Sequence, residues 1–197
     1  YLLPCVLSMT ELVKNYNSTV VMCSATQPDI QNFIKKYSGS SEIEITEIAS
    51  NIEGLFEFFK RTQITDIGHK DNLELAELIN KNNQALCIVN TKKHALELFE
   101  LVSGDNVYHL STLMAPVHRR KVIEDIKNKL KNKEKCVVIS TQLIEAGVDI
   151  DFPVVYRSMA GLDSIIQSAG RCNREGKLDV GRVYVFEPED NYKKHQP

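Results

Sequence analysis

Short apolar runs rich in β-branched residues alternate with segments of helical periodicity through most of this chain. The run at 84–89 suits a buried strand, and the segment at 92–102 that follows it places Ala95, Leu98 and Val102 on one helical face. Repeated β-α-β connections favour a parallel sheet, because each crossover lays a helix on a sheet face. The pattern therefore predicts an α/β fold, a parallel sheet with helices on both faces.

The other expected elements continue this alternation. Strands are expected at 20–23, 56–64, 107–110, 136–140, 154–157 and 181–186, and helices at 28–37, 71–82, 116–131 and 162–172. The segment at 43–48 fits either a strand or an extended linker. We expect residues 1–50 to be the tail of a preceding domain with its linker, and residues 51–197 to form one complete α/β domain.

Composition limits the partners and the compartment. The chain has 197 residues, 43% of them hydrophobic, so it can form a sizeable core; its net charge of −2 means that nucleic-acid binding needs a local patch. The five cysteines form no C-x-x-C pair, and we expect reduced thiols in a cytoplasmic protein without a metal site. No membrane span or signal peptide is expected. The chain begins at Tyr1 in mid-pattern, so we expect a piece of a longer protein.

The segment at 162–174 predicts an amphipathic helix with a basic stripe. Apolar side chains share one face at 100° per residue, and Gln167, Arg171 and Arg174 lie opposite. Two guanidinium groups held in register by a helix or its end can clamp a phosphate. The alternative is an ordinary solvated basic face.

Polar residues follow several of the expected strands. They are Ser24 and Thr26, Asn90 and Thr91, and Thr141 and Gln142, with Gly147 and Asp149 further along. Ligands of open α/β sheets collect at the carboxyl ends of the strands, so we expect Thr91, Thr141, Gly147, Asp149, Gln167, Arg171 and Arg174 along one edge. For Thr91, a simple helix N-cap is the alternative.

A phosphate-binding loop of the form G-x-x-x-x-G-K-[ST] is not found in this sequence. The nearest match, at 170–178, has one intervening residue too many and places Leu178 where a magnesium-binding hydroxyl is needed. The segment also follows a helix instead of preceding one. We therefore reject it.

Four segments, in order, resemble superfamily 2 helicase motifs. The string VMCSATQP at 21–28 resembles the S-A-T motif, CIVNTKKHA at 87–95 the motif that opens the second RecA-like domain, and STQLIEAGVDID at 140–151 motif V. The string QSAGRCNR at 167–174 is similar to motif VI. The strings SATQP, HLSTLMAPVHR and AGRCNR look most like the CRISPR-associated helicase–nuclease of type I systems, in its C-terminal helicase half only. Ser168 departs from many relatives, which carry arginine there.

The resemblance implies a RecA-like second domain of an ATP-dependent DNA helicase that acts on single-stranded DNA in CRISPR interference with a surveillance complex. ATP with Mg²⁺ would bind mainly to a first RecA-like domain. The implied roles are arginine fingers at Arg171 and Arg174, with Gln167 at the phosphate or attacking water; nucleotide contacts at Gly147, Asp149 and Gly170; DNA-backbone contacts at Thr91, Thr141 and Gln142; and coupling at Ser24 and Thr26.

Two other functions stay open at this point. One is a different superfamily 2 member, such as a DNA or RNA helicase outside CRISPR systems. The other, for the isolated piece, is a non-catalytic nucleic-acid-binding module, because the piece itself is expected to be inactive.

Overall fold

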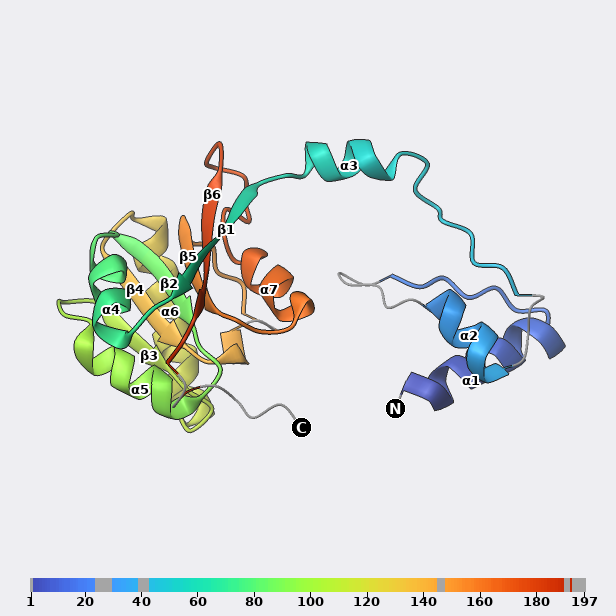
Figure 1. Ribbon diagram of the computed structural model, residues 1–197, viewed down its shortest axis with the longest axis horizontal. Helices are drawn as coiled ribbons and strands as arrows, with labels where there is room; N and C mark the ends of the chain where they lie inside the picture. The colour runs from blue at the N-terminus through green and yellow to red at the C-terminus, as the bar shows by residue number, and fades with distance from the viewer. Residues whose placement is uncertain (1, 24–29, 39–42, 145–147, 190–191, 193–197) are drawn as a thin grey trace. The chain divides into compact units, whose positions relative to one another are not determined.

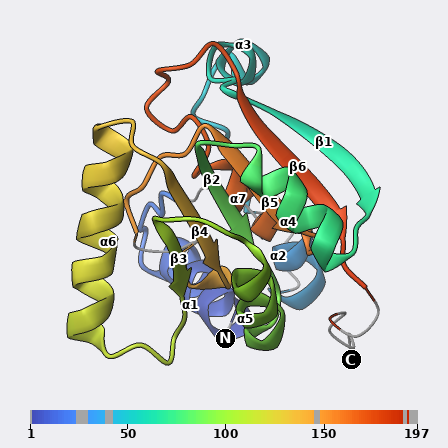
Figure 2. The same cartoon turned by 90° about the vertical axis from the view of Figure 1, so that its left-hand side faces the viewer.

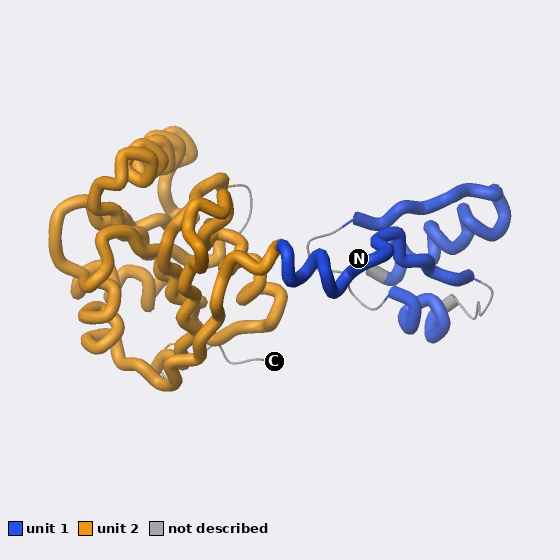
Figure 3. Tube along the Cα trace, turned by 90° about the horizontal axis from the view of Figure 1, so that it is seen from above, with its two compact units in different colours: residues 1–58 blue, residues 59–197 orange. Residues whose placement is uncertain are grey.

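The structure, a computed structural model, describes residues 2–23, 30–38, 43–144, 148–189 and 192. Its contacts divide the chain into two compact units, Tyr1–Phe58 and Phe59–Pro197 (Figure 3). The sequence placed a division at 50/51. The interpretation of residues 1–50 as the tail of a preceding domain stays a prediction.

Unit 1 contains three helices in its described part, α1 (Leu2–Asn15), α2 (Ile30–Ser38) and α3 (Ile52–Phe58). Helices α1 and α2 contact each other, and each buries one apolar side chain, Val6 and Ile34. The strand expected at 20–23 is wrong, because that segment pairs with no strand in the described residues and Val21 is exposed. A β-branched run becomes a strand only where a neighbouring strand takes up its backbone hydrogen bonds.

Unit 2 is built on a six-stranded sheet in the order β1-β6-β5-β2-β4-β3 (Figures 1 and 2). All five strand pairs are parallel, which confirms the predicted sheet. The strands are β1 (Thr62–His69), β2 (Gln84–Ile88), β3 (Val107–Leu110), β4 (Cys136–Ser140), β5 (Val154–Ser158) and β6 (Gly181–Glu187).

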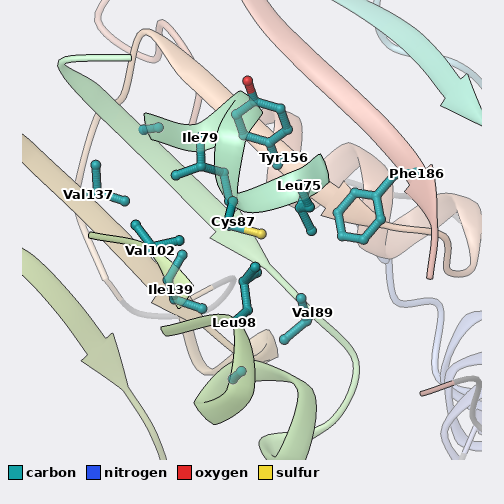
Figure 4. Close-up of a cluster of buried hydrophobic side chains, with 13 residues drawn as sticks. Leu75, Ile79, Cys87, Val89, Leu98, Val102, Val137, Ile139, Tyr156 and Phe186 are labelled. Carbon is teal, nitrogen blue, oxygen red and sulfur yellow. The ribbon is translucent and has the colours of Figure 1, made fainter. Parts of the chain in front are cut away.

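The helices of unit 2 cover both faces of the sheet. They are α4 (Asn72–Asn80), α5 (Lys92–Leu101), α6 (Pro116–Lys131) and α7 (Leu162–Ala169), with a short 3₁₀ helix, η1 (Gln142–Ile144). Helices α4 and α5 pack with Cys87 in one buried cluster (Figure 4), whereas α6 and α7 pack with Leu86 and Ile88 in the other. Successive residues of β2 therefore point to opposite cores, as the period of two requires.

Side chains at the helix N-termini fix where the helices begin. The Asp71 carboxylate accepts from the Glu74 amide at 2.8 Å in a capping box, and the Thr91 hydroxyl accepts from the His94 amide at 3.2 Å. Helix α6 begins with Pro116 in its first turn, where the missing N–H is not needed. These caps hold the connections that leave the carboxyl ends of the strands.

Two sequence predictions about element boundaries are wrong. The strand expected at 56–64 is replaced by the end of α3, and β1 begins only at Thr62, because a short apolar run is compatible with either state. The helix expected to reach residue 172 ends at Ala169, with Gly170 as its C-cap. Beyond it, Cys172 pairs with Phe152 in a parallel β-bridge, and this pairing takes the chain out of the helix.

Candidate functional site

The connection from β4 to β5 runs from the carboxyl ends of the strands to their amino ends. Thr141 directly follows β4 at the carboxyl end, and η1 comes next. The connection then reaches Phe152, two residues before the amino end of β5. We call its described residues, 141–144 and 148–152, the crossing loop.

The segment after α7 lies against the crossing loop. We call residues 171–176 the arginine turn. The Phe152 amide donates to the Arg171 carbonyl and the Asn173 amide donates to the Phe152 carbonyl, both at 2.9 Å. These two backbone bonds join the fourth motif string, 167–174, to Phe152, the residue that directly follows the third string, 140–151. The fold therefore brings the two predicted functional segments together.

Both arginines contact the crossing loop through their side chains. Arg174 Nε lies 3.2 Å from Asp149 Oδ1, and the two side chains are 46% and 75% exposed. Arg171 Nε donates to the Ile144 carbonyl at 3.2 Å, and this side chain is half-buried. A solvent-accessible guanidinium paired with a carboxylate can exchange that partner for a phosphate, because both anions accept from its planar donors.

The backbone of the arginine turn is held by three further side chains. Asp151 accepts from the Arg174 amide at 2.7 Å and from the Glu175 amide at 3.2 Å. Arg61 donates to the Arg174 carbonyl at 2.6 Å, and Asn173 donates to the Arg61 carbonyl at 3.0 Å. Sequence reasoning assigned no role to these three residues, although Asp151 and Asn173 stand inside the motif strings; nothing in the sequence points to Arg61.

The expectation that the predicted residues share the carboxyl edge is wrong for part of the set. Cys172 and Asn173 pack against Gly181, the first residue of β6, and the bridge at Phe152 precedes β5. Arg171 and Arg174 therefore lie beside the amino ends of β5 and β6. The reason is that α7 runs back across the sheet from the carboxyl edge, so its C-terminal end arrives at the opposite edge.

The other predicted residues are distributed along the sheet and α7. Thr91 caps α5, which is the alternative that the sequence left open, and it follows β2 at the edge where Thr141 follows the neighbouring β4. Thr141 is only 9% exposed, whereas Gln142 beside it is exposed. Gln167 is exposed on α7, and Gly170 caps that helix. Gly147, Ser24 and Thr26 lie outside the described residues.

Asn90 joins two strand ends beside Thr91. Its side-chain amide donates to the Met159 carbonyl at 2.8 Å and to Ser158 Oγ at 3.2 Å, and its oxygen accepts from the Arg157 guanidinium at 2.8 Å. Arg157 is fully buried on β5. This cluster ties the carboxyl ends of β2 and β5 together, so it fixes the position from which α5 and its cap leave the sheet.

Cys172 separates the two arginines of the turn but takes no part in their chemistry. It is 2% exposed, and burial, with a smaller effect of the nearby Asp151 charge, raises the pKa of its thiol to about 12. The thiol therefore stays protonated near neutral pH, and a neutral thiol is a poor nucleophile. Its contribution is packing beneath the turn.

A hollow of about 500 Å³ opens beside the crossing loop at the amino end of the sheet. Asp149 and Asp151 line it together with side chains of α6 and of the chain after the arginine turn, among them Lys127, Lys131 and Lys177. Carboxylates and ammonium groups thus share one recess, and no single charge sign dominates it. None of the helices in the described residues has the length and apolarity needed to cross a membrane.

Comparisons with known proteins agree with the motif order. Residues 81–177 match the family model described as CRISPR-associated nuclease/helicase Cas3, C-terminal. The CRISPR-associated nuclease/helicase Cas3 of Methanothermobacter thermautotrophicus is 26% identical over 206 residues, which cover 94% of this chain and 24% of that protein. The chain thus spans about a quarter of this curated relative.

Two solved structures share the fold. The crystal structure of T. fusca Cas3-ADP has a TM-score of 0.56 at 18% identity and covers 77% of this chain and 20% of its own. A CRISPR RNA-guided surveillance complex, pre-nicking, contains a chain with a TM-score of 0.55 at 19% identity, covering 80% of this chain and 22% of its own. The parallel sheet with its helices therefore has the RecA-like fold that these two structures share.

Proposed function

The chain is similar to the C-terminal helicase half of the Cas3 family, and from that premise we propose that it is the C-terminal part of an ATP-dependent helicase or translocase that acts on single-stranded DNA in CRISPR interference. The relatives named as CRISPR-associated nuclease/helicase support a helicase parent in a CRISPR system. The arginine fingers and the DNA contacts are our proposal.

One observation supports the finger assignment most directly: the Arg174 side chain is accessible and is paired with Asp149 across two motif segments. An arginine finger stabilises the charge that develops during phosphoryl transfer and typically contributes about 10³–10⁵ in rate. In this proposal Arg174 leaves Asp149 for the γ-phosphate, and Arg171, held by the Ile144 carbonyl, acts beside it. Gln167 orients the phosphate or the attacking water.

The residues present fit a part of a nucleotide site. A guanidinium and a carboxylate, both solvent-accessible and 3.2 Å apart, offer a donor for phosphate and an acceptor for a ribose hydroxyl. ATP with Mg²⁺ supplies the phosphoryl group, and we propose that a first RecA-like domain holds most of it. Asp149, with Gly147 and Gly170, contributes the remaining contacts. The T. fusca structure with ADP supports a nucleotide ligand for the fold.

The proposed DNA track uses the opposite edge of the sheet. Thr91 and Thr141 follow the adjacent strands β2 and β4, where hydroxyl and amide donors can hold phosphodiester oxygens without reading bases. Because Thr141 is nearly buried, the exposed Gln142 is the more accessible donor of the pair. Ser24 and Thr26 would couple hydrolysis to strand movement.

The remaining parts of the proposal concern partner and compartment. A chain of similar fold in a CRISPR RNA-guided surveillance complex supports such a complex as the partner. We propose a cytoplasmic location.

The experiment that tests the proposal compares two proteins. The full-length protein should hydrolyse ATP, with stimulation by single-stranded DNA, whereas the chain of 197 residues should show no turnover above background, since it has no phosphate-binding loop. Steady-state turnover by the pure chain, abolished by R171A, would contradict the assignment. A full-length protein that binds single-stranded DNA but never hydrolyses ATP would contradict the helicase assignment.

A further inference from the structure

The arginine turn lies outside the helices and strands, and its bridge to Phe152 holds Arg171 and Asn173 but not Arg174. It follows the C-cap of α7, and Asn173 within it has a left-handed φ of 46°. A side chain that acts on a transition state must nevertheless be held to a fraction of an ångström, because misplacement by about 1 Å can cost about 10²-fold in rate. Other groups must therefore hold Arg174 in place.

Asp151 holds the amide side of Arg174. One carboxylate oxygen accepts from the Arg174 amide at 2.7 Å and the other from the Glu175 amide at 3.2 Å. Hydrogen bonds to an ionised acceptor are roughly twice as strong as those between neutral groups. Asp151 comes from the crossing loop, as does Asp149, so that loop contacts both the side chain and the backbone of Arg174.

Arg61 holds the carbonyl side of the same residue. Its guanidinium donates to the Arg174 carbonyl at 2.6 Å, and its own carbonyl accepts from the Asn173 side chain at 3.0 Å and from the Gly181 amide at 2.9 Å. Arg61 thus contacts the arginine turn twice, through its side chain at the Arg174 carbonyl and through its own carbonyl at the Asn173 side chain. It stands three residues after Phe58, where unit 1 ends, and directly before β1.

We propose that Asp151 and Arg61 are positioning residues for Arg174, one fixing its amide and the other its carbonyl, and that through Arg61 the segment entering unit 2 is attached to the finger. The proposal rests on the proposed function of Arg174. Neither residue touches the reacting groups: each acts by setting the direction from which the Arg174 side chain leaves the backbone.

The chemistry of each contact separates positioning from folding. An asparagine at position 151 keeps the shape and one acceptor oxygen but replaces the second acceptor with a donor, so D151N keeps one of the two amide contacts. Lysine at position 61 can donate to one carbonyl but lacks the planar fork. Positioning therefore predicts a graded order of kcat: parent, then D151N, then D151A, and parent, then R61K, then R61A.

The test measures ATP turnover of the full-length protein in the presence of single-stranded DNA, normalised to the stoichiometry of nucleotide binding. We expect D151A to lower kcat by about 10- to 100-fold and R61A by about 10-fold, with KM changed less than about 3-fold. In an R174A background, D151A and R61A should lower kcat no further, because their effect passes through Arg174. D179A, which removes an exposed aspartate from the connection before β6, is the matched control and should behave as the parent.

The outcomes separate this inference from the proposed function. If R174A itself leaves kcat unchanged, the finger assignment fails. If R174A lowers kcat while D151A and R61A do not, or if they lower it equally in the R174A background, positioning is overturned. Amide exchange in the 197-residue chain gives a second readout: D151A should speed exchange at Arg174 and Glu175 while strand β4 stays protected. Unchanged exchange at these two amides would also overturn the proposal.

Discussion

Asp149 and Arg174 form an ion pair between the crossing loop and the arginine turn, with Oδ1 and Nε 3.2 Å apart. An exposed pair of this kind contributes about 0–1 kcal/mol to stability, so its partners can separate at little cost to the fold. The pair therefore keeps the Arg174 side chain beside the crossing loop without holding it tightly. The predicted consequences for the two partners differ.

Replacing Arg174 should act mainly on the chemical step. In the full-length protein, R174A should lower DNA-stimulated kcat by about 10³-fold or more while nucleotide affinity changes only a few-fold, because a finger binds the transition state more strongly than the ground state. ATP turnover and nucleotide titration measure the two effects. Turnover at the parent rate would mean that Arg174 is only a solvated surface residue.

Replacing Asp149 should act mainly on nucleotide binding. If its carboxylate accepts a ribose hydroxyl, D149A should raise KM for ATP by about 3- to 10-fold with a smaller change in kcat, since the contact is made equally before and during the reaction. The free energy of unfolding should change by less than about 1 kcal/mol, because the pair is exposed. A loss in kcat as large as that of R174A would show that Asp149 acts through the arginine.

The DNA track makes a separate prediction at the opposite edge. Q142A and T141A should weaken binding of single-stranded DNA and reduce its stimulation of ATPase activity, with a smaller change in basal hydrolysis. We expect the larger loss for Q142A, because Gln142 is exposed and Thr141 is 9% exposed. DNA titrations monitored by fluorescence anisotropy measure it, with S103A, in the exposed turn after α5, as the control. If the parent, Q142A, T141A and S103A all bind single-stranded DNA with equal affinity, Gln142 and Thr141 do not contact the DNA.

Where local pattern decides an element, the sequence was sufficient. The strands at 107–110 and 136–140 and the helix at 116–131 have the predicted bounds, because each combines a clear apolar period with turn residues at both ends. The strand at 20–23 failed because pairing is not a local property. Helix α7 is shorter than predicted because its last predicted turn pairs with Phe152, a contact between distant residues.

The sequence predicted which residues of the candidate site meet, but not at which end of the sheet they lie. Motif order led to Arg171, Arg174 and the loop that they contact, and those residues do meet. Their edge of the sheet was predicted wrongly, because the direction of α7 decides where its end arrives. The bond from Arg61 to Arg174 joins residues 113 positions apart, and no periodicity in a single sequence contains that information.

The buried cysteines give a prediction about the integrity of the core. Cys5 and Cys23 are exposed, whereas Cys87, Cys136 and Cys172 are buried, and burial raises the pKa of Cys136 and Cys172 to about 12. At about pH 8 a thiol reagent should modify two thiols quickly and the other three only after unfolding, because the thiolate is the reactive form. Mass spectrometry counts the modified sites. Rapid modification of a third thiol in the native protein would contradict the packing of unit 2.

His94 predicts how stability depends on pH. Its ring is 1% exposed, stacks on Tyr192 with centroids 4.2 Å apart, and its Nε2 lies 2.9 Å from the Asn72 side-chain oxygen, which places the proton on Nε2. Burial, partly opposed by the Glu97 charge, lowers the pKa of His94 from 6.5 to about 4. The folded state therefore resists protonation of this ring, whereas the unfolded state accepts it.

Between about pH 6.5 and pH 4 the unfolded chain binds more protons at this position than the native chain, so stability must fall as the pH falls through that window. From about pH 7.5 to about pH 5 the loss attributable to His94 should be about 2 kcal/mol. Urea unfolding of the chain at both pH values measures it, and H94Q should lose less stability over the interval than the parent.

The exposed H118Q is the matched control and should keep the parent's pH dependence. Because burial also lowers the pKa of His109, the difference between parent and H94Q, and not the parent's slope alone, isolates His94. Identical slopes for parent and H94Q would mean that the ring is already protonated or solvated in the native state, contrary to its packing against Tyr192.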